Sequence, residues 1–126
     1  MELQLKALLA SSDKEARQLV EDGLRELESG HARGSLLDLV TLWETGDLQR
    51  LDTYEQWCEC VVTPTEKLQM QRLLDDRNPA MARQMDALHQ AGERVLTAVG
   101  SLHMAGPRGL PALLGQMGYR VERLPR

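Results

Sequence analysis

Residues 93–107 read E-R-V-L-T-A-V-G-S-L-H-M-A-G-P, and this stretch governs the expected fold. Five of the six residues from Val95 to Gly100 are apolar or glycine, without the polar alternation of a half-exposed strand. A short apolar run of this kind, bounded by glycines, is typical of a strand buried on both faces. We therefore expect a buried strand at residues 95–99.

The residues after this run predict one more helix and one more strand. Residues 109–117 favour a short helix that ends at Gly118, and residues 119–122 then alternate between apolar and charged side chains. Such alternation indicates a half-exposed strand near a sheet edge. The helix is about as short as a crossover between parallel strands can be. We therefore expect a small C-terminal β-α-β unit.

Upstream, the chain carries helix signals. Ser12 and Glu15 have the spacing of a capping box, and the apolar residues behind them recur at helical spacing as far as Gly30. A second helix is expected from Ser35 to Gly46; its apolar residues cover most of its circumference, so it should be central.

Two further helix starts follow. Thr63, Pro64 and Glu66 combine a capping residue, a proline at the first helical position and a carboxylate at the third. Asn78 before Pro79 repeats the first two of these signals. The sequence thus predicts an α+β fold in one domain of residues 1–126, with a helical region at residues 1–91 and a β-α-β segment at residues 93–124.

Composition excludes several classes of function. The net charge is −4, the pI is near 5.4 and the basic residues are scattered, whereas a nucleic-acid surface needs a concentrated basic face. No apolar run approaches the roughly 20 residues that span a bilayer. Residues 1–10 lack the cationic segment and apolar core of a signal peptide. We therefore expect no nucleic-acid partner and no membrane segment in this chain.

Cys58 and Cys60 stand two residues apart, a spacing that is awkward for a disulfide between them. Two thiolates alone do not make a metal site, because a second cysteine pair is missing and the nearest histidine in sequence is distant. We expect two partly buried thiols.

His103 is the main candidate for chemistry. It follows the predicted strand, and open α/β sheets keep their ligand crevices where their strands end. A histidine in such a turn is also commonly a hydrogen-bonded loop residue, so both interpretations stand. The glycines nearby, Gly100, Gly106 and Gly109, do not have the spacing of a dinucleotide-binding loop, and a P-loop is absent from the sequence.

Two runs resemble the C-terminal half of the TraB/GumN family, which is related to Tiki-type membrane metalloproteases. They are R-N-P-A-M-A-R-Q-M-D-A-L at residues 77–88 and V-L-T-A-V-G-S-L-H-M-A-G-P-R-G-L-P-A-L-L-G-Q-M-G-Y-R-V at residues 95–121. A looser resemblance covers residues 12–57, with a W-x-x-G-D element at residues 43–47. The resemblance implies a metal-dependent, peptidase-like hydrolase in the parent protein, located in the bacterial envelope or secreted.

The resemblance also implies roles for particular residues. Members have two G-x-x-H motifs whose histidines converge on a metal or catalytic site. Gly100 and His103 match the second motif, so His103 is expected to be a ligand of a divalent metal or a base. Arg77 and Asn78 match the family's R-N pair, with Arg77 orienting an oxyanion or a carboxylate ligand and Asn78 mainly capping its helix. Gly100 and Gly106 are the candidates for binding a cofactor.

The first G-x-x-H motif is missing, since no other glycine of this sequence has a histidine three residues later. We therefore expect a C-terminal portion of such a domain that is inactive alone. The alternative is a non-catalytic helical interaction module. Either way, strands without sheet neighbours favour a partner, which would be a second copy in a homodimer or the missing N-terminal half.

Overall fold

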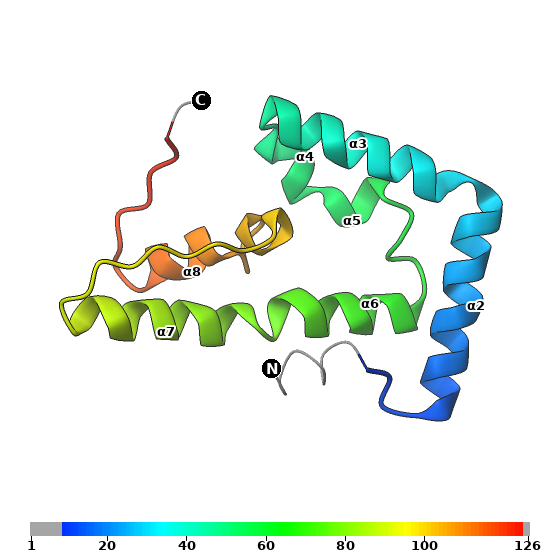
Figure 1. Cartoon of the computed structure of the whole chain (residues 1–126), viewed down its shortest axis with the longest axis horizontal. Coiled ribbons are helices and arrows are strands. Elements are labelled where there is room, and N and C mark those ends of the chain that lie inside the picture. The colour runs from blue at the N-terminus through cyan, green and yellow to red at the C-terminus, as the bar shows by residue number, and fades with distance from the viewer. Residues whose placement is uncertain (1–8, 125–126) are drawn as a thin grey trace. The chain divides into compact units, whose positions relative to one another are not determined.

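The computed structural model describes residues 9–124 and divides into two compact units (Figure 1). The first unit ends at Leu73 and the second begins at Leu74. A one-turn π-helix, η1 (Gln71–Asp75), spans the boundary between them. The prediction that residues 1–10 are not a signal peptide concerns residues that lie almost entirely outside the described ones.

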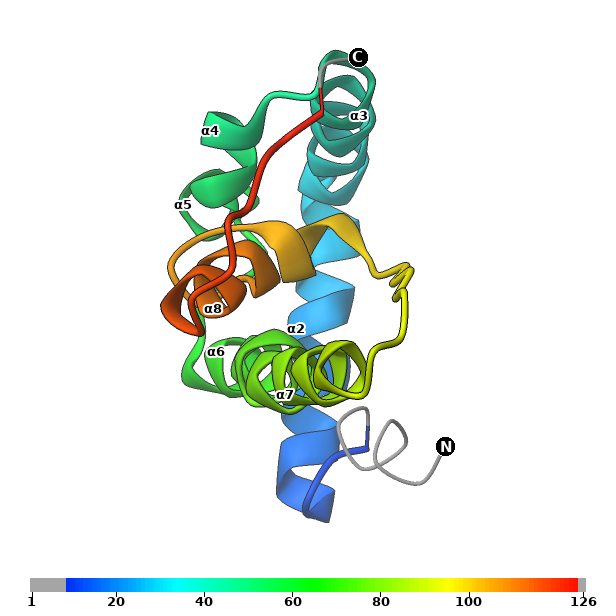
Figure 2. The same cartoon turned by 90° about the vertical axis from the view of Figure 1, so that its left-hand side faces the viewer.

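Within its described residues, the first unit contains five helices. They are α2 (Asp13–Ser29), α3 (His31–Thr45), α4 (Leu48–Asp52), α5 (Tyr54–Trp57) and α6 (Pro64–Met70). In both views α4 and α5 lie beside α3 (Figures 1 and 2). Among its described residues, the buried apolar ones are Leu42, Leu51, Cys58 and Val61.

Local sequence signals explain where these helices begin and end. The Ser12 hydroxyl accepts a hydrogen bond from the Glu15 amide at 3.2 Å, and Gly30 ends α2 in the left-handed conformation with φ +77°. Gly46 ends α3 in the same way. Thr63 and Glu66 form a reciprocal capping box at the start of α6. These predicted boundaries are confirmed.

A buried carboxylate joins α2 to the start of α6. Asp22 is 3% exposed and accepts hydrogen bonds from Gln18 Nε2 at 3.0 Å, Arg25 Nη2 at 2.7 Å and Thr63 Oγ1 at 2.8 Å. Gln18 and Arg25 belong to the same helix as Asp22, whereas Thr63 is the residue that caps α6. One side chain therefore both anchors a helix terminus and fixes the packing of two helices.

The second unit contains α7 (Asn78–Gln90), a short 3-10 helix η2 (Ser101–Met104) and α8 (Leu110–Gln116). Both views show α8 lying beside α7 (Figures 1 and 2). Ala82 of α7 and Leu110 of α8 are its buried apolar residues. The helix predicted at residues 109–117 is confirmed, with Gly109 as the residue before its first turn.

The predicted α+β fold and its β-α-β unit are wrong. Every regular element within residues 9–124 is helical, and residues 93–100 and 119–124 run without regular structure. Most of the expected strand is exposed, and Leu96 is 96% exposed. The apolar composition suits a buried strand, but a strand exists only when a neighbouring strand supplies a hydrogen-bonding partner. Sequence periodicity does not test for that partner.

Helix α3 also departs from expectation. It begins at His31 rather than Ser35, and it is peripheral: Leu42 is buried, while Leu36, Leu37, Val40 and Trp43 are exposed. An apolar circumference indicates a helix that can be buried on all sides, but the described elements of this unit leave much of α3 exposed.

The two cysteines form a disulfide instead of remaining thiols, with their Cα atoms 5.1 Å apart. Glu59 between them adopts φ +55°, and this turn brings the two Cα atoms within the range that a disulfide bridges. Among the helices of the described region, none is both long and apolar enough to cross a membrane.

Candidate functional site

His103 and Asn78 lie close together within the second unit. His103 lies in η2, three residues after Gly100, and Asn78 is the first residue of α7. His103 Nδ1 lies 2.6 Å from Asn78 Oδ1. The structure thus brings together two of the residues that the resemblance singled out, although 25 positions separate them in sequence.

The side chain of Asn78 is buried and joins two other segments by hydrogen bonds, rather than capping its helix. It is 2% exposed, and its Nδ2 donates to the backbone carbonyl of Arg108 at 2.8 Å. The residue before α7 is Arg77, which makes no capping hydrogen bond with its side chain. The expectation that Asn78 mainly caps its helix is therefore wrong, because its side-chain amide bonds instead to His103 in η2 and to the Arg108 carbonyl in the turn before α8.

These hydrogen bonds fix the tautomer of His103. A carbonyl oxygen only accepts, so the amide nitrogen of Asn78 must face Arg108 and its oxygen must face the imidazole. Nδ1 of His103 therefore carries the proton and donates it to Asn78. In the neutral ring the lone pair then lies on Nε2, which is the atom left to accept a proton.

The surroundings keep this imidazole neutral near pH 7. Burial lowers the pKa of His103 below its ordinary 6.5, and the positive charge of Arg77 lowers it further. A neutral, oriented imidazole can take up a proton from a hydroxyl group or from water. The arrangement is therefore suited to proton transfer at Nε2.

The other predicted site residues occupy supporting positions. Arg77 immediately precedes α7 and acts on His103 through its charge. Gly100 precedes η2, and a Cβ placed on it would lie 4.0 Å from His103 Cδ2. Gly106 has φ +68°, a conformation that side chains disfavour, in the turn after η2. The part proposed for Gly100 and Gly106 in binding a cofactor stays a prediction.

Sequence reasoning missed two residues that shape the site. The backbone carbonyl of Arg108 orients Asn78, while its guanidinium pairs with Asp75 at 2.7 Å. Gly109 is buried, and a Cβ placed there would meet the Ala105 carbonyl oxygen at 2.4 Å. The sequence of residues 106–109, the G-P-R-G turn, predicts a glycine-rich turn. Nothing in that sequence indicates that two backbone segments approach each other closely.

The donor set does not fit a metal ion by itself. A hydrolytic zinc site ordinarily uses three protein ligands, and here one imidazole nitrogen is already bonded to Asn78. Within residues 9–124, no three histidine, cysteine or acidic side chains gather in a way that would hold a metal. The expected divalent metal therefore has one candidate ligand in this region, His103.

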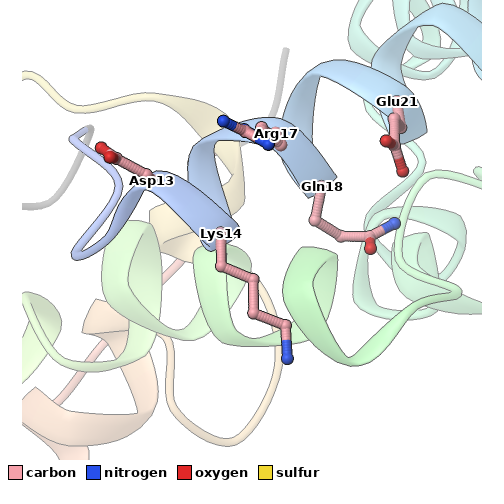
Figure 3. Close-up of a pocket in the computed structure, with 5 residues that line it drawn as sticks. All are labelled: Asp13, Lys14, Arg17, Gln18 and Glu21. Carbon is pink, nitrogen blue, oxygen red and sulfur yellow. The ribbon is translucent and has the colours of Figure 1, made fainter.

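Two surface hollows lie away from His103. One, of about 420 Å³, follows the first turns of α2, and Figure 3 shows its five lining side chains pointing in different directions. Another, of about 350 Å³, lies in the second unit and includes His89 and Tyr119. There the Tyr119 hydroxyl donates to Asp86 Oδ1 at 2.7 Å, and His89 packs edge-on against Tyr119. Neither hollow gathers groups around a common point in the way that Asn78 and His103 do.

Comparisons with known proteins address the resemblance directly. Neither the curated proteins nor the solved structures contain a match to this chain. The model of the TraB/PrgY/gumN family matches residues 1–123, which extends well beyond the region where the sequence resemblance is specific. The chain therefore belongs to the TraB/PrgY/gumN family.

Proposed function

We propose that this chain supplies the histidine-bearing part of a hydrolytic site, in which His103 Nε2 takes the proton of the attacking nucleophile. The observation that carries the proposal is the hydrogen bond from His103 Nδ1 to the buried Asn78, which leaves Nε2 as the basic atom. The lowered pKa of His103 supports it, because a base must be unprotonated to work.

Asn78 acts here as a positioning residue. It touches His103 and the Arg108 carbonyl, so it sets the ring's orientation and tautomer without contacting the reacting atoms. Arg77 places a positive charge close to the imidazole, and that charge suits the negative oxygen that develops during attack on a carbonyl.

The site is incomplete within the described residues, so the remaining groups come from outside them. A single imidazole ligand does not hold a divalent ion against water, and no step of this proposal passes through a metal. We accordingly propose that the 126-residue chain alone binds no divalent metal tightly and hydrolyses neither peptides nor esters.

Imidazole nitrogen NMR of the whole chain tests the role of Asn78. We expect His103 to be the Nδ1–H tautomer with a pKa below 6.5, and Asn78→Ala to return a mixture of tautomers and a changed pKa. His89→Ala serves as the control, since it removes the other histidine of the same unit, whose ring packs against Tyr119. An Nε2–H tautomer in the unmodified chain would remove the proposed base.

Zn²⁺ titration followed by elemental analysis tests whether the site is incomplete. We expect no stoichiometric zinc in the unmodified chain or in His103→Ala. If zinc binds one-to-one, is lost in His103→Ala and is kept in His89→Ala, the chain contains a complete site and the proposal of a partial one is wrong. Hydrolysis of a peptide or ester by the isolated chain, absent in His103→Ala, leads to the same conclusion.

A second candidate function, self-association without catalysis, rests on residues 94–99. This extended segment is largely exposed, and in the described structure its backbone makes no hydrogen bond to another backbone segment. Unpaired extended backbone with apolar side chains such as Leu96 is a template for strand pairing. A second copy of the chain carries the same segment and provides a matching row of donors and acceptors.

Thr97→Pro separates this function from the first one. Proline removes a backbone donor and is disfavoured inside paired strands, whereas Thr97→Ala keeps the donor. Sedimentation across a hundredfold range of concentration should show a dimer for the unmodified chain and for Thr97→Ala, and a monomer for Thr97→Pro. A monomer for all three at every concentration would exclude self-association through this segment.

A further inference from the structure

The first unit contains a second chemically distinctive feature, the turn Cys58–Glu59–Cys60 between α5 and α6. Its disulfide joins residues only two positions apart. A cross-link stabilises a protein mainly by restricting the unfolded chain, and the restriction grows with the length of the closed loop. A bridge this short restricts the unfolded chain very little, so structural stabilisation is a poor account of it.

The backbone opposes the closed form of this turn. Glu59 has φ +55°, and it is the one non-glycine residue with positive φ in the described part of the chain. A side chain with a Cβ disfavours this conformation, which glycine adopts freely. Opening the disulfide would let Glu59 return to an ordinary conformation. The unfavourable backbone conformation of Glu59 therefore opposes formation of the disulfide and favours its reduction.

The two sulfurs differ in access. Cys58 is fully buried, and its carbonyl accepts a hydrogen bond from the Ser35 hydroxyl at 2.9 Å, which anchors it against α3. Cys60 is only partly buried. A thiolate from solution therefore reaches Cys60 Sγ more readily than Cys58 Sγ.

Each sulfur also has a hydrogen-bond donor nearby. The Cys60 amide donates to Cys58 Sγ at 3.1 Å, and the Tyr54 hydroxyl lies 3.2 Å from Cys60 Sγ. Donors at sulfur stabilise the thiolate, which is the leaving group when a disulfide is cleaved. Burial, followed by the negative charge of Glu26, raises the pKa of Tyr54, so its hydroxyl keeps its proton.

From these contacts we propose that Cys58–Cys60 is a thiol–disulfide exchange site for a dithiol reductant, with Cys60 Sγ as the sulfur attacked and Cys58 Sγ as the leaving sulfur. The site lies in the first unit and uses none of the residues assigned to hydrolysis.

The reaction takes place in two balanced steps. One thiolate of the reductant attacks Cys60 Sγ, the Cys58–Cys60 bond breaks, and Cys58 leaves with the electron pair and takes up a proton. The second thiolate of the reductant then attacks the reductant's own sulfur in the mixed disulfide and expels Cys60, which takes up another proton. The protein gains two electrons and two protons, and the dithiol is oxidised to its disulfide.

The first experiment equilibrates the 126-residue chain with reduced and oxidised dithiothreitol, quenches it with acid, and counts thiols by alkylation and mass spectrometry. We expect a reversible conversion of one disulfide into two thiols, with the far-UV circular dichroism of the folded chain retained. A bridge that resists 10 mM dithiothreitol until urea unfolds the chain would be a structural disulfide and would overturn the proposal. So would two thiols that never pair under oxidised dithiothreitol.

A matched pair of variants tests which sulfur is attacked. In Cys58→Ser the remaining Cys60 should form a mixed disulfide with oxidised glutathione at least tenfold faster than the remaining Cys58 does in Cys60→Ser. Equal rates, or the reverse order, would contradict the assignment of Cys60.

Variants of Glu59 test the equilibrium between the disulfide and the two thiols without removing either sulfur. Glu59→Gly accepts positive φ, so it should shift the equilibrium toward the disulfide by about fivefold. Glu59→Gln keeps the Cβ but loses the charge that pairs with His31 at 2.6 Å, and it should leave the equilibrium nearly unchanged. An equilibrium that responds to Glu59→Gln and not to Glu59→Gly would show that the ion pair, rather than the backbone, controls the bridge, and would overturn this part of the argument.

Discussion

Within the described residues, each unit has one buried polar side chain that joins separate segments, Asp22 in the first and Asn78 in the second. The two differ in the chemistry of their hydrogen-bond partners. The partners of Asp22 are structural: two residues of its own helix and the cap of α6. Asn78 also has a structural partner, the Arg108 carbonyl, but its second partner is the imidazole of His103. A network that ends on a titratable ring with a remaining lone pair can act on a substrate, whereas one whose bonds are all internal holds helices together.

The polar atoms of both side chains are hydrogen-bonded, which is the usual requirement for burying polar groups. Within the described residues, every buried side-chain nitrogen and oxygen atom has a hydrogen-bond partner. The difference between the units is therefore not one of packing quality. It lies in the chemistry of the last group in each network, and substitutions distinguish the two cases.

The largest effect is expected from Gly109→Ala in the second unit. The added Cβ would lie 2.4 Å from the Ala105 carbonyl oxygen and 2.9 Å from two backbone carbons, so the turn that carries the Arg108 carbonyl must move. Overpacking against backbone costs typically 1 to 3 kcal/mol, and we expect about 2 to 3 kcal/mol of lost stability here. Urea denaturation, with hydrogen exchange of residues 74–124, measures the loss.

Gly115→Ala is the matched control, because no atom lies within 4 Å of a Cβ at that position of α8. In a helix, alanine replaces glycine with a gain of about 0.5 to 1 kcal/mol. Equal effects of the two substitutions would mean that the close approach at Gly109 does not constrain the turn. The network around Asn78 would then not depend on the G-P-R-G turn.

Asp22→Ala should give the next largest effect, in the first unit. Removing the carboxylate leaves the Thr63 hydroxyl and the Gln18 amide without their acceptor in a partly buried place. Such losses amount to about 2 kcal/mol, with little added by Arg25 because its side chain is 60% exposed. Tryptophan fluorescence during urea denaturation reports on this unit, because Trp43 and Trp57 both lie in it.

Glu21→Ala tests whether the loss is specific to the buried network. Glu21 is exposed on the same helix, and exposed substitutions usually change stability by less than 0.5 kcal/mol. If the two substitutions changed stability equally little, the hydrogen bonds of Asp22 would not hold the two helices together. The structural role that is contrasted with the role of Asn78 would then be wrong.

The comparison also separates what sequence predicts from what it does not. Helix ends were predictable because their signals are local: Thr63, Pro64 and Glu66 act within one turn, and Gly30 and Gly46 act at single positions. His103 was predicted as a candidate from its place after an apolar run, and Arg77 and Asn78 were found through the resemblance. Their geometry was not predicted, because the contact between Asn78 and His103 joins positions far apart in sequence.

The two predictions that were wrong, the buried strand and the free thiols, failed for related physical reasons. Val95–Val99 has the composition of a buried strand, but strand formation depends on a partner that composition does not reveal. Cys58 and Cys60 were expected to stay apart because their spacing is unfavourable, and the positive φ of Glu59 removes that obstacle. The absence of a neighbouring strand within residues 9–124 decided the first case, and the backbone conformation of Glu59 decided the second. The sequence pattern specifies neither.

The smallest effect expected is a difference between the units in their response to acid. Burial, together with Arg77, lowers the pKa of His103 below 6.5, so the unfolded chain binds more protons at this residue than the folded chain does. Stability of the second unit should therefore fall as pH drops from 6.5 to the folded pKa, by at most about 1.4 kcal/mol per pH unit, and the loss should then level off. His103→Gln should flatten this slope in the hydrogen exchange of residues 74–124.

Asp22 responds in a lower window and for a different reason. Burial alone would raise the pKa of Asp22, but hydrogen bonds from Thr63, Gln18 and Arg25 outweigh it and hold the pKa below 3.8. Its contribution to stability is present above pH 3.8 and is lost as pH falls through the folded pKa. Asp22→Asn should remove that loss from the tryptophan-detected transition while leaving the slope near pH 6 unchanged. A single acid transition, shared by both probes and unaffected by either substitution, would mean that neither buried residue controls its unit's response to acid.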